Sequence, residues 1–249
     1  MKKKFIIGIP ILLIIIICSF IFFNQRIPEN LPENSTLIDE IESTLDGRKV
    51  DKILDRQLVG ERHAFFPYIG ENGRRGISVW SVEKGKWTLG AVSNGGEPAL
   101  WKIDQDNPDT FYFVWNLHPD DQVEQLEIFF ERERNFNISG SQQRYIPQIF
   151  SKDEMENNKD YGVQAIPESW KELLEQQASL EQPQKTGPAA MFNHSESIQP
   201  LQLSYVPYNE EGEHIQLDEK GGQYSFYNGE QLDMIPWVDP SMLKEEQLQ

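Results

Sequence analysis

Residues 5–23 form an uninterrupted apolar run, FIIGIPILLIIIICSFIFF, and this run limits what the chain can become more than any other feature. None of its 19 residues carries a charge. As a helix rising about 1.5 Å per residue they would extend roughly 28 Å, close to the hydrocarbon thickness of a bilayer. A helix buried in a globular core would show a polar face within two turns, and this run has none. The sequence therefore predicts one transmembrane helix over residues 5–23.

Two alternatives to an uncleaved anchor stay open, and both would remove this run from the mature protein. A secretion signal ends in a small-x-small cleavage site, but the run ends in bulky rings up to Phe23. A lipoprotein signal would use Cys18, but Ile17 stands before it where Gly or Ala is usual. The sequence favours an uncleaved anchor over both alternatives.

The lysines flanking the apolar run predict its orientation. Residues 2–4 are all lysine, whereas a single basic residue, Arg26, closely follows the run. Because cytoplasmic flanks are enriched in Lys and Arg, residues 1–4 are expected to form a short cytoplasmic N-terminus. Everything after residue 23 is then expected to lie outside, in a single-pass membrane protein.

Composition excludes several classes of function for the remaining chain. In 249 residues, 40 acidic and 23 basic side chains give a formal charge of −17, so we expect no nucleic-acid partner. The single cysteine cannot form an intrachain disulfide or a thiolate cluster. No sequence pattern calls for a cofactor, and we expect none.

Changes in composition divide the predicted outer part into three segments. Residues 24–35 contain two prolines and little apolar content, and they are expected to form a spacer. Residues 36–180 carry the regular patterns and are predicted to form one extracytoplasmic α+β domain. Residues 181–249 are acidic and contain prolines, and we expect them to be partly docked on that domain or extended.

Apolar periodicity predicts the elements of the 36–180 domain. Spacings of three and four residues predict a helix over about 36–46, and the same pattern leaves a resumption toward residue 58 open. Further short helices are expected from the capping box of Ser151 and Glu154, and after Pro167. Alternating apolar residues separated by turn compositions predict about six strands. These are expected at 64–69, 77–82, 86–92, 99–103, 110–117 and 123–138. The fold class is therefore an α+β domain with an antiparallel sheet or sandwich of about six strands and flanking short helices.

The segment after residue 181 carries weaker strand signals. Short apolar stretches occur at 201–208, 215–217 and 223–227, and Asn228 with Gly229 has the composition of a tight hairpin turn.

No catalytic or metal-binding motif stands out. The loop DQDNPD places Asp104, Asp106 and Asp109 at spacings that could suit calcium, but the EF-hand pattern is not met. Such residues usually cap turns through their own backbone. The four histidines lie in separate segments, and neither G-x-S-x-G nor H-E-x-x-H occurs. We expect no catalytic residues, cofactor-binding residues or metal ligands, and an enzyme is the less favoured interpretation.

Aromatic rings concentrate between Phe65 and Phe150, and most of them are expected to fill a core. Where rings occur on both faces of one strand, the second face needs a cover, which could be a partner. The residues of this possible binding surface are Trp80, Tyr112, Trp115 and Phe129. The sequence thus favours a membrane-anchored binding or accessory protein with a protein or envelope-polymer partner. The alternatives are a tethered hydrolase acting on polysaccharide or peptide, and a structural subunit of a membrane complex.

Overall fold

The computed structural model describes residues 26–139, 142–155, 159–181, 201–217 and 225–243, so the predicted transmembrane helix at 5–23 lies outside them. Over these described ranges no helix is both long and apolar enough to cross a bilayer. The chain divides into two compact units. Unit 1 comprises the described residues of Met1–Asn94 and Tyr224–Gly229, and unit 2 those of Gly95–Gln223 and Glu230–Gln249.

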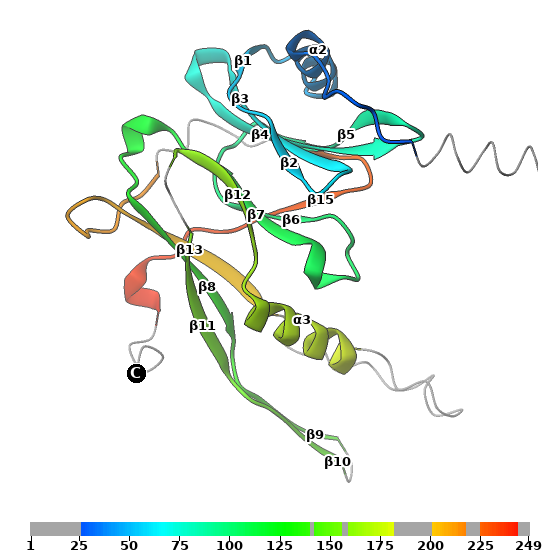
Figure 1. The fold of residues 1–249 in the computed structure, drawn as a ribbon. Coiled ribbons are helices and arrows are strands. Elements are labelled where there is room, and N and C mark those ends of the chain that lie inside the picture. The colour runs from blue at the N-terminus through cyan, green and yellow to red at the C-terminus, as the bar shows by residue number, and fades with distance from the viewer. Residues whose placement is uncertain (1–25, 140–141, 156–158, 182–200, 218–224, 244–249) are drawn as a thin grey trace, which may run out of the picture. The chain divides into compact units, whose positions relative to one another are not determined.

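Unit 1 is an antiparallel sheet with one helix, α2 (Asn34–Thr44) (Figure 1). The strand order is β1-β3-β4-β5-β14, and β2 also pairs with β3. The strands are β1 (Val50–Ile53), β2 (Gln57–Val59), β3 (His63–Gly70), β4 (Arg75–Glu83), β5 (Lys86–Ser93) and β14 (Ser225–Tyr227), and a short 3-10 turn covers Glu71–Gly73.

Helix α2 packs its apolar stripe on the sheet of unit 1. Leu37, Ile41 and Leu45 are almost fully buried, in one cluster with Phe66 and Trp80. The predicted helix over 36–46 is confirmed within the usual uncertainty at helix ends. Its predicted resumption is wrong, because residues 50–53 pair with β3 as strand β1. Val50 and Ile53 are both buried although they lie three residues apart, because the strand register shifts between Val50 and Lys52.

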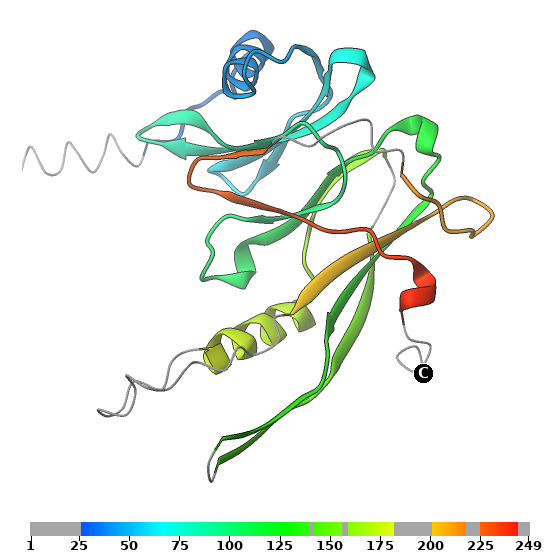
Figure 2. The same cartoon turned by 180° about the vertical axis from the view of Figure 1, so that it is seen from behind.

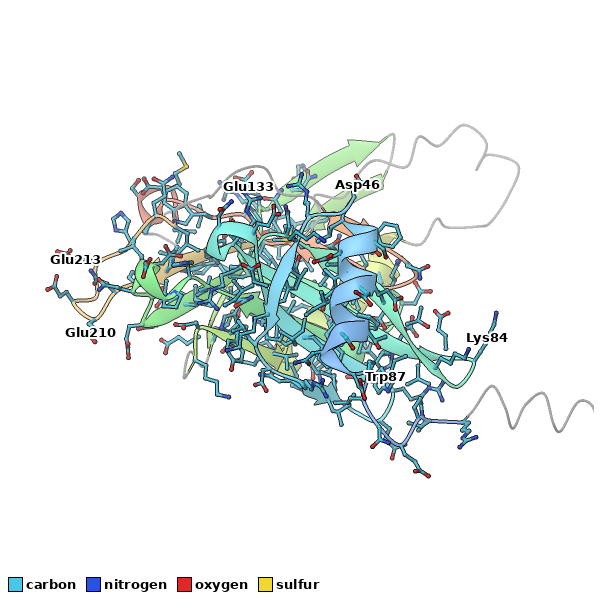
Figure 3. The ribbon with its side chains drawn as sticks, turned by 90° about the horizontal axis from the view of Figure 1, so that it is seen from above. Asp46, Lys84, Trp87, Glu133, Glu210 and Glu213 are labelled. Carbon is cyan, nitrogen blue, oxygen red and sulfur yellow. The ribbon has the colours of Figure 1, made fainter. Side chains whose placement is uncertain are left out.

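Strands β4 and β5 are joined by a tight turn at Lys84 and Gly85. Both residues have positive φ, at 49° and 75°, which matches the right-handed twist of a hairpin. Figure 3 shows the Lys84 side chain extending outward from the tip of this turn. Elsewhere in the sheet, a Cβ at Gly76 would lie 2.2 Å from the ring of Tyr68, so this position requires glycine. The Tyr68 hydroxyl donates a buried hydrogen bond to the Ser93 carbonyl at 2.9 Å.

Unit 2 contains two antiparallel sheets, a two-stranded ribbon and helix α3 (Glu168–Glu181). One sheet has the order β12-β7-β6-β15 and the other β11-β8-β13, and β9 pairs with β10 in the ribbon. The strands are β6 (Ala99–Lys102), β7 (Phe111–Asn116), β8 (Gln125–Arg132), β9 (Asn135–Ser139), β10 (Gln142–Ile146), β11 (Ile149–Met155), β12 (Tyr161–Ala165), β13 (Gln202–Tyr208) and β15 (Gln231–Met234). Short 3-10 turns cover Pro108–Thr110, Pro119–Asp121 and Pro240–Met242.

The two sheets of unit 2 share one core, which is closed at one end by α3. Trp170 of α3 stacks on Phe130 of β8, with ring centroids 4.9 Å apart, and meets Phe113 of β7 edge to face at 5.9 Å. The Trp170 indole N–H donates to the Ser151 hydroxyl at 2.7 Å. The helix predicted after Pro167 is therefore confirmed, and it joins both sheets to one core.

The β-rich fold class is confirmed, with antiparallel sheets and two short helices among the described residues. The predicted single sheet or sandwich of about six strands is too simple, because the described chain holds 15 strands in four sheets. The residues assigned by sequence to one domain, 36–180, are shared between the two units. The segment 181–249 supplies β13 and β15 to unit 2 and β14 to unit 1.

Two local predictions are wrong. The capping box at Ser151 and Glu154 does not start a helix, because residues 149–155 form strand β11 along the full length of β8. Pairing with a buried neighbour outweighs a local capping signal. Asn228 and Gly229 do not close a hairpin either, because β14 pairs with β5 and β15 pairs with β6.

Candidate binding pocket in unit 2

A pocket of about 560 Å³ lies in unit 2, and this volume is within the range of small-molecule sites. Its floor is apolar and combines residues from β6, β7, β8 and α3 with the loop before α3. These residues are Leu100, Phe113, Phe130, Ile166, Trp170 and Leu174. Both sheets and the helix thus contribute to one pocket.

The pocket lies where two edge strands separate. At Tyr205, β13 lies beside the chain that follows β15: the Tyr205 N–H donates to the Pro236 carbonyl at 3.0 Å, and the Val238 N–H donates to the Tyr205 carbonyl at 3.1 Å. Before this point β15 pairs instead with β6, in the other sheet. Figure 2 shows the two chains diverging from their meeting point, β13 toward α3 and β15 toward β6. The pocket is lined by residues from both diverging chains.

Consecutive residues of both edge chains line the pocket. They are Leu201–Ser204 on one side and Asp233–Val238 on the other. A pocket on one face of a strand would be lined by every second residue, because side chains alternate between faces. An unbroken run therefore means that the pocket reaches the main-chain edge of each strand.

Three ionisable side chains lie on the pocket wall: Lys102, Glu131 and Asp233. The ammonium group of Lys102 lies 2.5 Å from a carboxylate oxygen of Asp233, and 5.6 Å from the centre of the Phe111 ring. This ion pair links β6 to β15, and its two charges cancel each other. With Glu131 added, the wall carries a net negative charge.

Two buried polar atoms of the wall have no hydrogen-bond partner among the described residues: the Ser204 hydroxyl and the Trp237 indole N–H. Ser204 is only 6% exposed. A buried donor left without an acceptor costs about 1–3 kcal/mol, so such groups usually serve a purpose. Both atoms could bond a ligand that enters the pocket.

Arg132 lies on β8 beside the pocket and is 5% exposed. Its guanidinium donates to the Gln177 side chain of α3 and to the Pro147 carbonyl at 3.3 Å. Burial lowers the pKa of Arg132. No carboxylate in the described part of the chain pairs with it, so two neutral oxygens hold this cation under α3.

The four aromatic residues singled out from the sequence lie in different places. Trp80 is fully buried in unit 1. In unit 2, Trp115 is buried in the main core, Phe129 is buried in a separate cluster with Val206, and Tyr112 is half-buried beside Trp101 at 5.9 Å. A binding role for these rings stays a prediction, and the burial of three of them gives it no support.

The aspartates of the DQDNPD loop bond to their own turn. Asp104 accepts from the Asp106 N–H at 3.1 Å, and Asn107 accepts from the Asp109 N–H at 3.2 Å. Across the described ranges, no group of three acidic, histidine or cysteine side chains is placed to hold a metal ion.

Sequence reasoning missed the pocket residues Lys102, Leu203, Ser204 and Trp237. No sequence pattern singled them out; Pro236 is the residue that could have pointed to this region, because a proline has no N–H to donate to a strand ladder. Searches against family models, curated proteins and solved structures found no match to this chain.

Proposed function

We propose that this chain is a single-pass, membrane-anchored binding protein that acts outside the cytoplasm, with the pocket of unit 2 as its binding site. The partner would be a protein or an envelope polymer. The observation that supports binding is the pocket itself: about 560 Å³ with an apolar floor and two unpartnered buried polar groups. The apolar run at residues 5–23 and its flanking lysines support the anchor.

The pocket favours binding over catalysis. The alternative of a tethered hydrolase would need convergent acid and base groups in a cleft. Here Lys102 and Asp233 are occupied with each other, and Glu131 is the remaining ionisable side chain of the described pocket wall. No specific observation supports the hydrolase, so we do not propose it.

Binding can be tested with the full-length chain in lipid nanodiscs and the neutral apolar dye N-phenyl-1-naphthylamine, with the signal of empty nanodiscs subtracted. Leu174 lines the pocket. Its neighbour Leu173 packs against the core but is not part of the pocket lining. We expect dye binding to the wild type, loss of that binding in Leu174→Trp, and retention in the matched control Leu173→Trp. Equal dye binding by Leu174→Trp and Leu173→Trp would show that the dye does not occupy this pocket.

The anchor and orientation need a separate test in intact cells. A tag at the C-terminus should be removed by protease added outside, and the chain should stay in the membrane fraction after alkaline extraction. A tag that resists protease until the cells are lysed would contradict the proposed orientation.

A further inference from the structure

We infer that the pocket receives an extended peptide segment, which pairs with the main-chain edges of β13 and β15 and places alternate apolar side chains between the two sheets. This inference rests on the proposed function, because it names the class of partner for the same pocket. Four observations on unit 2 support it: an open edge on β13, an open edge on β15, the composition of the pocket floor, and the charge of the wall.

The first open edge is at Leu203. Tyr205 directs both its N–H and its carbonyl away from β8, toward Pro236 and Val238. In an antiparallel strand these directions repeat every second residue, so the main chain of Leu203 also points away from β8. Among the described residues nothing pairs with it on that side, and Leu203 lines the pocket.

The second open edge is at Met234. The Ile235 N–H donates to the Pro98 carbonyl at 3.0 Å, next to β6, so by the same alternation the Met234 N–H and carbonyl point away from β6. Pro236 follows and has no N–H to offer to β13. The proline therefore helps to keep the two edges apart where the pocket opens, and in the described chain neither edge has a partner there.

Open edges on both sides distinguish a peptide from other ligands. A lipid chain would use the apolar floor but leave the main-chain groups of Leu203 and Met234 unpaired, whereas an extended peptide can pair with them as an added strand. Its side chains alternate, so every second one would face Phe113, Phe130 and Trp170. The Trp237 N–H and the Ser204 hydroxyl supply further polar contacts at the same wall.

The charge of the pocket wall restricts the sequence of the peptide further. The wall carries Glu131 and Asp233 against one Lys102, and the whole chain carries a formal charge of −17. A peptide with apolar residues at every second position and Lys or Arg between them fits both features. Long-range attraction would speed its arrival, and this effect should weaken as salt is added.

The decisive variant is Leu203→Pro, which removes one edge N–H. That N–H points away from β8, so the variant leaves the β8–β13 ladder intact. Pro207 already occupies the equivalent position of the same strand, four residues on, which shows that β13 accommodates proline there. The matched control, Leu203→Ala, keeps the N–H but loses most of the side chain.

The experiment selects an eight-residue randomised peptide library, displayed on phage, against the full-length chain in nanodiscs. The most enriched peptide is then synthesised with capped ends, and its binding is measured by fluorescence anisotropy. We expect apolar residues at every second position, at least tenfold weaker binding to Leu203→Pro, and a smaller loss with Leu203→Ala. On peptide addition, hydrogen exchange should slow at the Leu203 and Met234 amides.

Two outcomes would overturn the inference: a selection that enriches no peptide, or an enriched peptide that binds Leu203→Pro and the wild type with equal affinity. Failure of the proposed binding function would give a different result: no dye binding to the wild type, or dye binding that Leu174→Trp leaves unchanged. Dye binding that Leu174→Trp abolishes, with no peptide selected, would leave a pocket that binds a ligand of another class.

Discussion

The two units cover their sheets in different ways. In unit 1 a single helix, α2, lies on the sheet and packs Leu37, Ile41 and Leu45 against its rings. In unit 2 two sheets face each other, and α3 closes one end of their shared core. The edge strands β13 and β15 of those sheets meet only near Tyr205, and beside this meeting point the pocket opens.

This difference is the reason why we place the proposed binding site in unit 2. Both units have sheets with edge strands. In unit 2 two edge strands that meet near Tyr205 leave the main-chain groups of Leu203 and Met234 open beside a pocket. Open edges are a hazard for aggregation unless they are short or used. In unit 2 the open positions lie inside a pocket, which fits use by a partner.

The largest expected effect comes from removing a ring in each unit. Trp80 is fully buried in unit 1, and Trp80→Ala should lower the free energy of unfolding by about 3–5 kcal/mol. Trp170→Ala in unit 2 should cost less, near the low end of this range, because the space it leaves adjoins an existing pocket. Hydrogen exchange of the full-length chain, followed peptide by peptide, measures both. If either variant lowered the free energy of unfolding equally in both units, the two units would unfold in one cooperative step.

A second comparison concerns the two glycines that lie against rings. A Cβ at Gly76 would meet the Tyr68 ring at 2.2 Å, and one at Gly162 would meet the Trp115 ring at 2.4 Å. Overpacking of this kind costs about 1–3 kcal/mol. Both Gly76→Ala and Gly162→Ala should therefore destabilise their own unit, as measured by denaturant titration. Relief of the Gly76→Ala loss in the double variant with Tyr68→Leu would verify the contact, and additive losses would argue against it.

Removal of one buried hydroxyl should affect the stability of the two units differently. Tyr68→Phe in unit 1 breaks a buried hydrogen bond to the Ser93 carbonyl and should cost about 1 kcal/mol. Ser204→Ala in unit 2 removes a buried hydroxyl that has no described partner, so it should cost almost nothing in stability. Thermal unfolding of both variants tests this. A clear loss of stability in Ser204→Ala would show that its hydroxyl already has a partner.

The strands were predictable, and the way they combine was not. Stretches of aromatic and β-branched residues between turn sequences located most ends of β3 to β8 to within about two residues. The expectation that each strand buries only one face is too simple, because β3, β4 and β8 each bury five consecutive residues and so both faces. The turn composition SNGGEP between β5 and β6 reads like a hairpin, yet these strands belong to different sheets. Their neighbours β14 and β15 come from more than 120 residues further along the chain, a distance that no local pattern can bridge.

The pocket was unpredictable for the same reason. Its wall brings together Leu100, Phe130, Trp170 and Trp237, which no sequence spacing connects. The capping box at Ser151 misled for a related reason: the Ser151 hydroxyl accepts from the Trp170 indole instead of capping a helix. The proposed anchor at residues 5–23 differs from the pocket in that it can be predicted without tertiary contacts, because its length and apolarity are properties of the sequence alone.

The smallest expected effect is a difference in pH response. Burial, aided by the charge of Arg62, lowers the pKa of His63 in unit 1 below its ordinary value of 6.5. The folded state then binds fewer protons than the unfolded state, so stability is present above pH 6.5 and is lost as the pH falls toward the folded pKa. Burial raises the pKa of Asp153 in unit 2 above 3.8, so its contribution has the opposite sign and is lost as the pH rises through the folded pKa. Hydrogen exchange between pH 7 and 5, corrected for the intrinsic rate, should show unit 1 weakening, and His63→Gln should flatten that slope. An unchanged slope in His63→Gln would assign the pH response of unit 1 to another group.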